Sequence, residues 1–384
     1  MKCIVPKRRP LSGLLRAVLF ISVCRFAVPP AFATTPSAGV RVQGPGVAPQ
    51  LFFACCDRGA AQMQSLFADP RVIADLKDLH AGLGVAITDF NPERAEFVRR
   101  LNQAGIPAVA GLGLSKEQGF YFNADNAPAA AARFAAFDAW SRDQGLRWDG
   151  VGLDIEPNFG ELAALRGHPW RLFTTLLRRA VDGQRVLHAR QAYSTLIRNI
   201  RSRGYFVQTY QMPYLPIERI AHSSLPDRLL GTIDVRGDQE VLMLYTSYAR
   251  SAGAAIIWEL GPDAQAISIG VTDGDPIANP TVLNWNKFSR DLIVASHFSH
   301  LIGVYNLEGC VRQGFLPRLM TMDWSQSVTI PADAIRRADH RRRMLEWILW
   351  ISSHLLYLVA VLLLAIASIG WRWRIRRLKG NPGF

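Results

Sequence analysis

Short apolar runs alternate along the chain with longer stretches in which apolar residues recur at helical spacing. Parallel strands that are buried on both faces give near-continuous apolar runs, and their alternation with helices is typical of βα units. Eight repeats, with no GxGxxG motif after the first, favour a closed (β/α)₈ barrel over an open doubly wound sheet. The eight predicted strands are residues 50–56, 83–89, 108–112, 150–155, 205–210, 240–245, 266–271 and 301–305.

Two connections between these runs are longer than a single crossover helix requires. Residues 159–204, after the fourth run, contain enough helical pattern for more than one helix, and residues 214–237 extend the fifth connection. Shorter connections predict helices over residues 92–104 and 127–144. Because the loops that follow barrel strands lie at the C-terminal face, we expect the two insertions to shape a cleft there.

The N-terminal flank has the three parts of a secretory signal. Lys7, Arg8 and Arg9 are basic, residues 11–24 are apolar, and residues 31–33 (Ala-Phe-Ala) provide a cleavage site between small residues. We predict a signal peptide over residues 1–33, with an uncleaved anchor as the alternative. Residues 34–48 are rich in proline, glycine and small residues, which predicts a linker to a barrel domain over residues 49–330.

A second apolar segment, residues 350–370, is long enough to cross the hydrocarbon core of a bilayer. Trp347, Trp350, Trp371 and Trp373 stand at its edges, where such rings prefer the membrane interface. We predict a transmembrane helix over 350–370, a juxtamembrane helix over 331–349 and a basic cytoplasmic tail over 371–384. Cations flank both sides of the span, so the export signal decides the orientation and puts the barrel outside the cytoplasm, periplasmic or extracellular.

The formal net charge of +13 is concentrated in the two flanks. Residues 1–33 hold six cations and residues 371–384 hold five, without any acid, which leaves +2 for the rest of the chain. Such a nearly neutral domain lacks the broad basic surface that binds phosphate backbones, so we expect no nucleic-acid partner. There is no HExxH or Cys-x-x-Cys spacing, and we expect neither a metal nor a cofactor.

Three cysteines remain in the predicted barrel domain. Cys55 and Cys56 end the first predicted strand, and Cys310 follows the eighth, which neighbours the first in a closed barrel. We predict a disulfide between one of the first pair and Cys310, formed outside the cytoplasm. The alternative is three reduced cysteines in the core.

Two acids share a face at the end of the fourth predicted strand. Because side chains alternate along a strand, Gly152, Asp154 and Glu156 point one way and the apolar residues between them point the other. Functional groups of a barrel come from the C-terminal ends of its strands. Two carboxylates held close raise the pKa of one of them, which provides a proton donor near neutral pH. The alternative is a helix cap or a structural ion pair.

Residues 149–156, Asp-Gly-Val-Gly-Leu-Asp-Ile-Glu, carry a resemblance to a known family. The segment resembles the strand-four motif Asp-Gly-x-Asp-x-Asp-x-Glu of the family 18 glycoside hydrolases, the chitinases and their relatives. The resemblance implies that Glu156 is the general acid and that Asp154 orients the substrate and supports the donor. Tyr245 matches the tyrosine of the family's strand-six motif Met-x-Tyr-Asp and is implied to bind substrate. Tyr305 stands where the family has an aromatic platform, usually Trp.

The chain departs from this family at two acidic positions. Gly152 replaces the first interior Asp of the strand-four motif, and Thr246 replaces the Asp of the strand-six motif. A second resemblance, to the large clan of retaining hydrolases, rests on Glu156 before a proline at the end of strand four. That clan has a Glu nucleophile at the end of strand seven, where this chain offers Asp273 and Asp275, which are either a second carboxylate or turn and cap residues.

Other polar and aromatic residues at strand ends are candidates for substrate binding. Sugars stack their C–H faces on aromatic rings, although any such ring is equally suited to wall packing. The acids among them have loop or cap roles as their alternatives. The candidates are Asp57, Asp89, Tyr210, Gln211, Tyr214, Tyr245, Tyr248, Asp273, Tyr305 and Glu308.

These patterns together predict a membrane-anchored barrel that hydrolyses glycosidic bonds in an envelope or secreted polysaccharide, with Glu156 as the acid. The alternative is a non-catalytic glycan-binding barrel that serves polysaccharide assembly or export, which the missing acids at Gly152 and Thr246 favour. A structural membrane scaffold is the third possibility, but it does not require acids in a barrel mouth.

Overall fold

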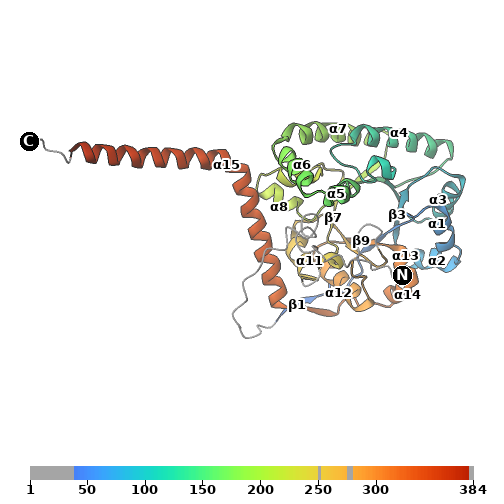
Figure 1. Ribbon diagram of the computed structural model, residues 1–384. Helices are drawn as coiled ribbons and strands as arrows, with labels where there is room; N and C mark the ends of the chain where they lie inside the picture. Colours follow the sequence, from blue (N-terminus) through green and yellow to red (C-terminus); the bar gives the residue numbers. More distant parts are fainter. Residues whose placement is uncertain (1–38, 250–251, 275–279, 380–384) are drawn as a thin grey trace, which may run out of the picture.

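The computed structural model describes residues 39–249, 252–274 and 280–379. In this part of the chain, eight parallel strands form a closed barrel in the order β2 to β9, with helices around it (Figure 1). The sheet closes where β2 pairs with β9, with Gln50 opposite Leu301 and Ala54 opposite Tyr305. The barrel strands are β2 (Gln50–Cys55), β3 (Gly82–Ile87), β4 (Ala108–Leu112), β5 (Gly150–Asp154), β6 (Phe206–Gln211), β7 (Gln239–Met243), β8 (Ala266–Gly270) and β9 (Leu301–Tyr305).

Each predicted apolar run overlaps one of these strands, so the predicted (β/α)₈ barrel is confirmed. The runs 108–112 and 301–305 coincide with β4 and β9, and each of the other strands differs from its predicted run by one or two residues at one or both ends. The runs are apolar because their outward side chains pack under the helices, as the fully buried Phe53, Leu83 and Ile269 do.

The helices around the barrel begin and end at ordinary capping signals. The Asn91 side chain accepts a hydrogen bond from Arg94 N ahead of Pro92, and Gly105 ends that helix with a left-handed φ of 70°. Asn158 and Asn284 cap two further helices in the same way. The helices before the insertions are α1 (Ala60–Leu66), α2 (Pro70–Asp78), α3 (Pro92–Ala104) and α4 (Ala127–Asp143), with the 3₁₀ turn η2 (Lys116–Gln118).

Both insertions are helical, which was expected for the first of them. The connection from β5 to β6 holds three helices, α5 (Phe159–Arg166), α6 (Pro169–Val181) and α7 (Gly183–Ser202), and the next holds α8 (Leu215–Ile220) and α9 (Leu225–Leu230). The remaining connections contain α10 (Thr246–Ala249), α11 (Ala255–Leu260), η3 (Gly261–Asp263), α12 (Trp285–Ser296), α13 (Leu307–Arg312) and α14 (Phe315–Met320).

In the barrel interior, an aromatic ring on one strand packs against glycines on the neighbouring strand. A Cβ atom on Gly82 would lie 2.3 Å from Phe52 Cε2, and one on Gly84 would lie 3.5 Å from the other edge of the same ring. The ring of Phe52 therefore occupies the space that side chains on β3 would otherwise take. The lower barrel is a packed core, as is usual for this architecture, and its mouth is where polar groups gather.

The predicted linker is wrong at residues 40–43. Val40–Gln43 form strand β1, which pairs antiparallel with β10 (Ser327–Ile330). Val42 and Ile330 are 2% and 1% exposed, and burial of these apolar side chains orders a segment whose composition resembles a linker. The predicted signal peptide, residues 1–33, lies outside the described residues.

Helix α15 (Ala332–Lys379) includes the predicted juxtamembrane helix and the predicted span. Its first part packs against α8, α9 and α11, where Arg342 pairs with Asp263 and Glu346 at 2.9 Å each. Its distal part extends away from the barrel (Figure 1). None of the helices in the described ranges is apolar over enough of its length to cross a membrane. The side chains at 356, 358, 360–362 and 365, within the predicted span, lie outside the description, and the predicted span is not confirmed.

The predicted disulfide is wrong. Cys55, Cys56 and Cys310 are all buried and unpaired. Cys310 points its Sγ at Thr272, 3.8 Å from Oγ1, and this residue follows β8 rather than β2. Closure of the barrel brings the segments together but does not aim the thiols at one another, so the alternative of three reduced core cysteines holds.

Replacement of Phe52 by alanine tests the packing of the barrel interior. Phe52→Ala leaves a cavity above Gly82 and Gly84, which cannot fill it, and should lower the free energy of unfolding by about 3–5 kcal/mol. Phe206→Ala is the control, because Phe206 is 43% exposed at the start of β6 and its loss should cost less than about 1 kcal/mol. Urea unfolding measures both values, and equal losses of stability would contradict the role of Phe52 in filling the barrel interior.

Candidate functional site

The two acids of the strand-four motif lie where the sequence predicts them. Asp154 is the last residue of β5, and Glu156 follows two positions later on the same face. The intervening Ile155 is fully buried in the opposite direction and bridges to Phe122. Both acids are partly exposed, but Asp154 Oδ1 is shielded from solvent and has no hydrogen-bond donor.

The two carboxyl groups interact directly. Desolvation by burial raises the pKa of Asp154 to about 7, although the hydrogen bond with the Glu156 side chain acts to lower it. A shielded oxygen without a donor favours a proton held between the two groups. The pair can therefore keep one proton close to neutral pH, and Glu156 is the member nearer the barrel opening.

The position of the Tyr210 ring accounts for the glycine at position 152 of the strand-four motif. Tyr210 stands beside Asp154 in the register of β5 and β6, and its ring leans over Gly152. A Cβ atom on Gly152 would lie 3.0 Å from Tyr210 Cε2, so the ring takes the space of the acid that the resemblance leads one to expect. The Tyr210 hydroxyl donates to Gln208 Oε1 at 3.1 Å, deeper in the barrel.

Three tyrosines line the mouth between β6 and β9. Burial raises the pKa of Tyr245, and the charges of Asp154 and Glu156 raise it further, which places this ring within their field. The Ser268 hydroxyl donates to Tyr245 Oη at 3.3 Å. The rings of Tyr245 and Tyr305 lie with centroids 6.0 Å apart and planes inclined by 32°. The structure therefore brings Tyr210, Tyr245 and Tyr305 together, as the sequence predicts.

A second acidic group lies at the ends of β2 and β9. The Tyr305 hydroxyl donates to Asp57 Oδ2 at 2.8 Å, and Asp57 Oδ1 is buried without a partner. Glu308, which is 4% exposed, accepts a hydrogen bond from Cys56 N at 2.8 Å, and burial raises its pKa to about 7. Because β9 stands four strands from β5 around the barrel, this group faces the Asp154–Glu156 pair across the mouth.

Other predicted site residues are held by neighbouring groups. Asp273 binds Arg312 at 3.0 Å and lies 3.5 Å from Arg58; burial acts to raise its pKa, but hydrogen bonding to Arg312 outweighs this and lowers it. Gln211 is 1% exposed and donates to Val235 O, away from the mouth. Asp275 lies outside the described residues.

Asp89 is bound in an ion pair. Its carboxylate accepts two hydrogen bonds from the fully buried Arg94, and these lower its pKa. Arg94 also donates to Ala86 O at 2.6 Å, so the pair secures the end of β3 to the start of α3. Asp89 therefore has a structural role, as an ion-pair partner rather than the cap or loop acid that the sequence offered as the alternative.

Sequence reasoning missed Ser268 and Arg312. Ser268 is a polar residue inside the apolar run of β8, and that position is the signal that it faces the barrel interior. Arg312 lies in α13 and gives no local signal, because only the fold brings it to Asp273.

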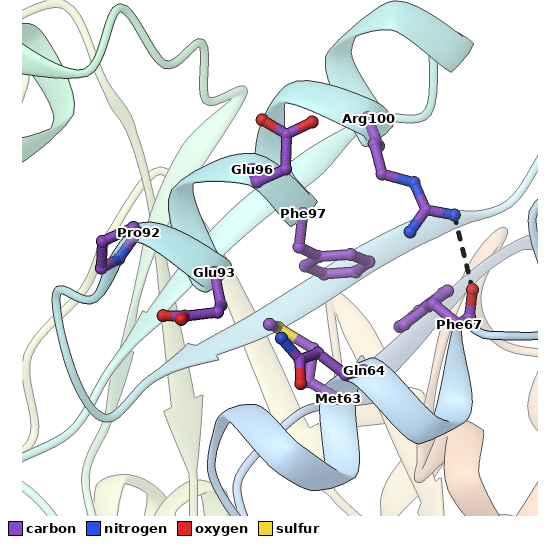
Figure 2. A pocket seen from close by; sticks show the side chains of 8 residues that line it. All are labelled: Met63, Gln64, Phe67, Pro92, Glu93, Glu96, Phe97 and Arg100. Atoms are coloured by element: carbon purple, nitrogen blue, oxygen red, sulfur yellow. Dashed lines mark hydrogen bonds between the residues drawn. The ribbon is translucent and has the colours of Figure 1, made fainter.

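A hollow outside the barrel is separate from this mouth. A cavity of about 320 Å³ lies between α1 and α3, over a floor that includes Met63 and Phe97 and beside the carboxylates of Glu93 and Glu96 (Figure 2). Arg100 donates to Phe67 O across one end of it. None of the predicted site residues lines it. The described part of the chain contains no cluster of three or more His, Cys, Asp or Glu that could hold a metal ion.

Comparisons with known proteins give weak likenesses. No protein-family model and no curated protein matches the sequence. The glycoside hydrolase domain of PgaB (BpsB) from Bordetella bronchiseptica is 10% identical over 71% of this chain and 98% of its own, with a TM-score of 0.42. The exo-β-1,4-mannosidase Op5Man5 from Opitutaceae bacterium strain TAV5 is 9% identical over 83% and 63%, with a TM-score of 0.41.

Proteins of other activities match at a similar level. A mutant tryptophan synthase α-subunit from Pyrococcus furiosus is 11% identical over 73% of this chain and 97% of its own, with a TM-score of 0.37. The matched proteins therefore do not distinguish between activities, and any function has to be argued from the residues of this chain.

The raised pKa of Asp154 predicts a pH-dependent stability. Between about pH 4, where an unfolded Asp releases its proton, and about pH 7, the folded chain holds a proton that the unfolded chain has lost. The contribution of Asp154 to the free energy of unfolding therefore falls as the pH rises through this range, and it is lowest at the upper end. Urea unfolding at pH 5 and pH 8 should show Asp154→Asn gaining stability relative to the wild type as the pH rises. Asp143→Asn, at an exposed position in α4, should show the same pH dependence as the wild type. If the stability difference between Asp154→Asn and the wild type were the same at pH 5 and pH 8, the raised pKa of Asp154 would be contradicted.

Proposed function

We propose that this chain is a glycoside hydrolase that cleaves glycosidic bonds in an envelope or secreted polysaccharide. The observation that carries the proposal is the hydrogen-bonded pair of Asp154 and Glu156 at the C-terminal end of β5, with the desolvated Asp154 raising the proton affinity of the pair. Glycosidic cleavage needs an acid that is still protonated near neutral pH and can reach the leaving-group oxygen. Glu156 is the member of the pair nearer the barrel opening, and Asp154 holds and orients it.

The proton balance of the reaction follows from this pair. Glu156 donates its proton to the glycosidic oxygen as the bond from that oxygen to the anomeric carbon breaks. A water molecule then supplies hydroxide to the anomeric carbon, and its proton returns to the pair. Stacking of sugar faces on Tyr245 and Tyr305 and hydrogen bonds to Tyr210 would hold the substrate between the two acidic groups.

Asp57 is our candidate for the second carboxylate of the mechanism. It lies across the mouth from Glu156, and its one described partner, the Tyr305 hydroxyl, leaves Oδ1 without a hydrogen bond. In contrast, Asp273 is neutralised by Arg312 and Arg58, which makes it a poor base or nucleophile. This assignment replaces the strand-seven acid that the retaining-hydrolase resemblance would require.

A non-catalytic glycan-binding barrel is the second candidate function. Both acids that the family 18 resemblance would add are absent, and their places are filled. The ring of Tyr210 covers Gly152, and Thr246 donates its hydroxyl to the buried Asp291. A mouth that keeps tyrosines and loses acids can bind a sugar chain without cutting it.

We also propose that the distal part of α15 anchors the barrel in a membrane, with the barrel outside the cytoplasm. Large apolar side chains there are exposed along a helix that leaves the barrel, and Trp347 and Trp371 stand near the two ends of this segment. Water is a poor solvent for such a helix, whereas a bilayer is a good one. The exposed residues include Ile351, Leu355, Tyr357, Val359, Leu363, Leu364, Ile366 and Ile369.

Replacement of Glu156 tests the hydrolase. Purified full-length chain, in a detergent without sugar groups, is incubated with N-acetylglucosamine polymers and envelope glycans, and new reducing ends are counted. Glu156→Gln cannot donate the proton and should lower kcat/KM at least about a hundredfold. The wild-type rate should fall above about pH 7, because the pair then loses its proton.

Glu117→Gln is the matched control, since Glu117 is an exposed carboxylate near the mouth and should leave the rate unchanged. Cleavage that survives Glu156→Gln would overturn the assigned acid. If no glycan is cleaved but binding is measured and survives the substitution, the binding barrel is the function.

Truncation tests the anchor. A chain that ends after residue 353 keeps the hydrogen bond from Ser353 to Ala221 O but loses the exposed apolar residues from Leu355 onwards. The full chain should stay with membranes after alkaline extraction, whereas the truncated chain should be released in a folded form. Release of both chains would contradict the anchor.

A further inference from the structure

Helix α6, in the long connection after β5, carries an apolar stripe on its outward face. Trp170, Phe173, Leu177 and Val181 are 75%, 54%, 58% and 79% exposed. Their spacing of three, four and four residues puts them on one side of the helix. The rings of Trp170 and Phe173 stack with centroids 5.5 Å apart. A contiguous stripe of this kind marks an interaction surface.

The opposite face of α6 is already packed. Leu172 and Arg179 are 6% and 7% exposed, and Arg179 pairs with Glu161 of α5 at 2.7 Å. The helix also packs against α9. Because these contacts fix its inner face, the apolar stripe cannot turn inwards, and its exposure belongs to the folded barrel.

The charge of α6 indicates which kind of surface the apolar stripe binds. The helix contains three arginines and no acid. Arg171 and Arg178 are exposed and border the stripe along one edge. An apolar stripe with tryptophan and a basic border is the pattern of helices that lie in the plane of a membrane interface, where anionic headgroups pair with the cations.

The position of α6 points to the same membrane as α15. Helix α9, on which α6 packs, also contacts α15. The Ser352 hydroxyl forms a hydrogen bond with the Ser223 hydroxyl, and the Ser353 hydroxyl donates to Ala221 O, just before α15 leaves the barrel. Figure 1 shows α6 and α8 on the side of the barrel from which α15 extends. Helix α6, which carries the stripe, and the distal part of α15 therefore lie on one side of the molecule.

We propose that α6 is an interfacial helix that lays its stripe in the headgroup region of a bilayer containing anionic lipid, beside α15. The inference goes beyond glycan hydrolysis and adds a second contact to the proposed anchor. A single helix lets a domain tilt freely, whereas a second contact fixes its orientation. The mouth of the barrel would then be held at a set height and angle above the membrane.

Site-specific quenching tests this contact in the full chain. Cys3 and Cys24 are replaced by serine, and an environment-sensitive fluorophore is attached at Phe173→Cys, while the buried native thiols stay unlabelled. The chain is reconstituted in vesicles of phosphatidylcholine and phosphatidylglycerol that carry a spin label close to the headgroup. The same label at Gln64→Cys is the control, because Gln64 is exposed on α1, on the other side of the barrel.

The label on α6 should be quenched at least about twofold more than the label on α1. Arg171→Glu with Arg178→Glu should remove most of this difference, and Arg198→Glu on α7 should not. A chain that stays in the vesicles with equal quenching at both positions would overturn the α6 contact and leave the anchor standing. Quenching between labels on two copies in detergent, without lipid quenching, would assign the stripe to a dimer instead. Neither result bears on the reducing-end assay.

Discussion

Closure of the parallel sheet between β2 and β9 is the constraint on which the candidate site depends. All eight strands run in one direction, so their C-terminal ends meet at one rim, and the loops after them face one another. Closure makes Tyr305 and Asp57 hydrogen-bonding partners although 248 residues separate them in the chain. It also puts β5 opposite β9, so that two acidic groups face each other across a mouth lined with tyrosines.

The packing of the interior connects the shape of the mouth with its electrostatics. Rings from neighbouring strands fill the space above interior glycines, as Phe52 does above Gly82 and Tyr210 above Gly152. At Gly152 this exchange removes one acid of the family motif. The same tyrosine stands beside Asp154 in the register of β5 and β6, and desolvation of that carboxyl group raises its pKa.

Ion pairs distinguish two kinds of acid near the mouth. Asp273 and Asp89 are both bound by arginines that lower their pKa values, whereas desolvation raises the pKa values of Asp154 and Glu308, which form no ion pair among the described residues. An acid that is compensated by a guanidinium stays ionised and holds the loops in place. An acid that is buried without compensation retains a proton near neutral pH, and this is the property that glycosidic cleavage uses.

The order of apolar runs determined the barrel, because strands buried on both faces need continuous apolar sequence and each run could be recognised locally. The period of two along residues 150–156 likewise determined that Asp154 and Glu156 share a face. Other features depended on the tertiary structure. The sequence of the short strand β1 resembles a linker, and only its pairing with β10, in which Val40 lies opposite Ile330, makes it a strand. The direction of the Cys310 thiol likewise follows from packing and not from its position in the sequence. Whether Asp273 is a reactive acid or an ion-paired one was decided by Arg312, because an interaction between distant residues has no local pattern and exists only once the chain has closed around it.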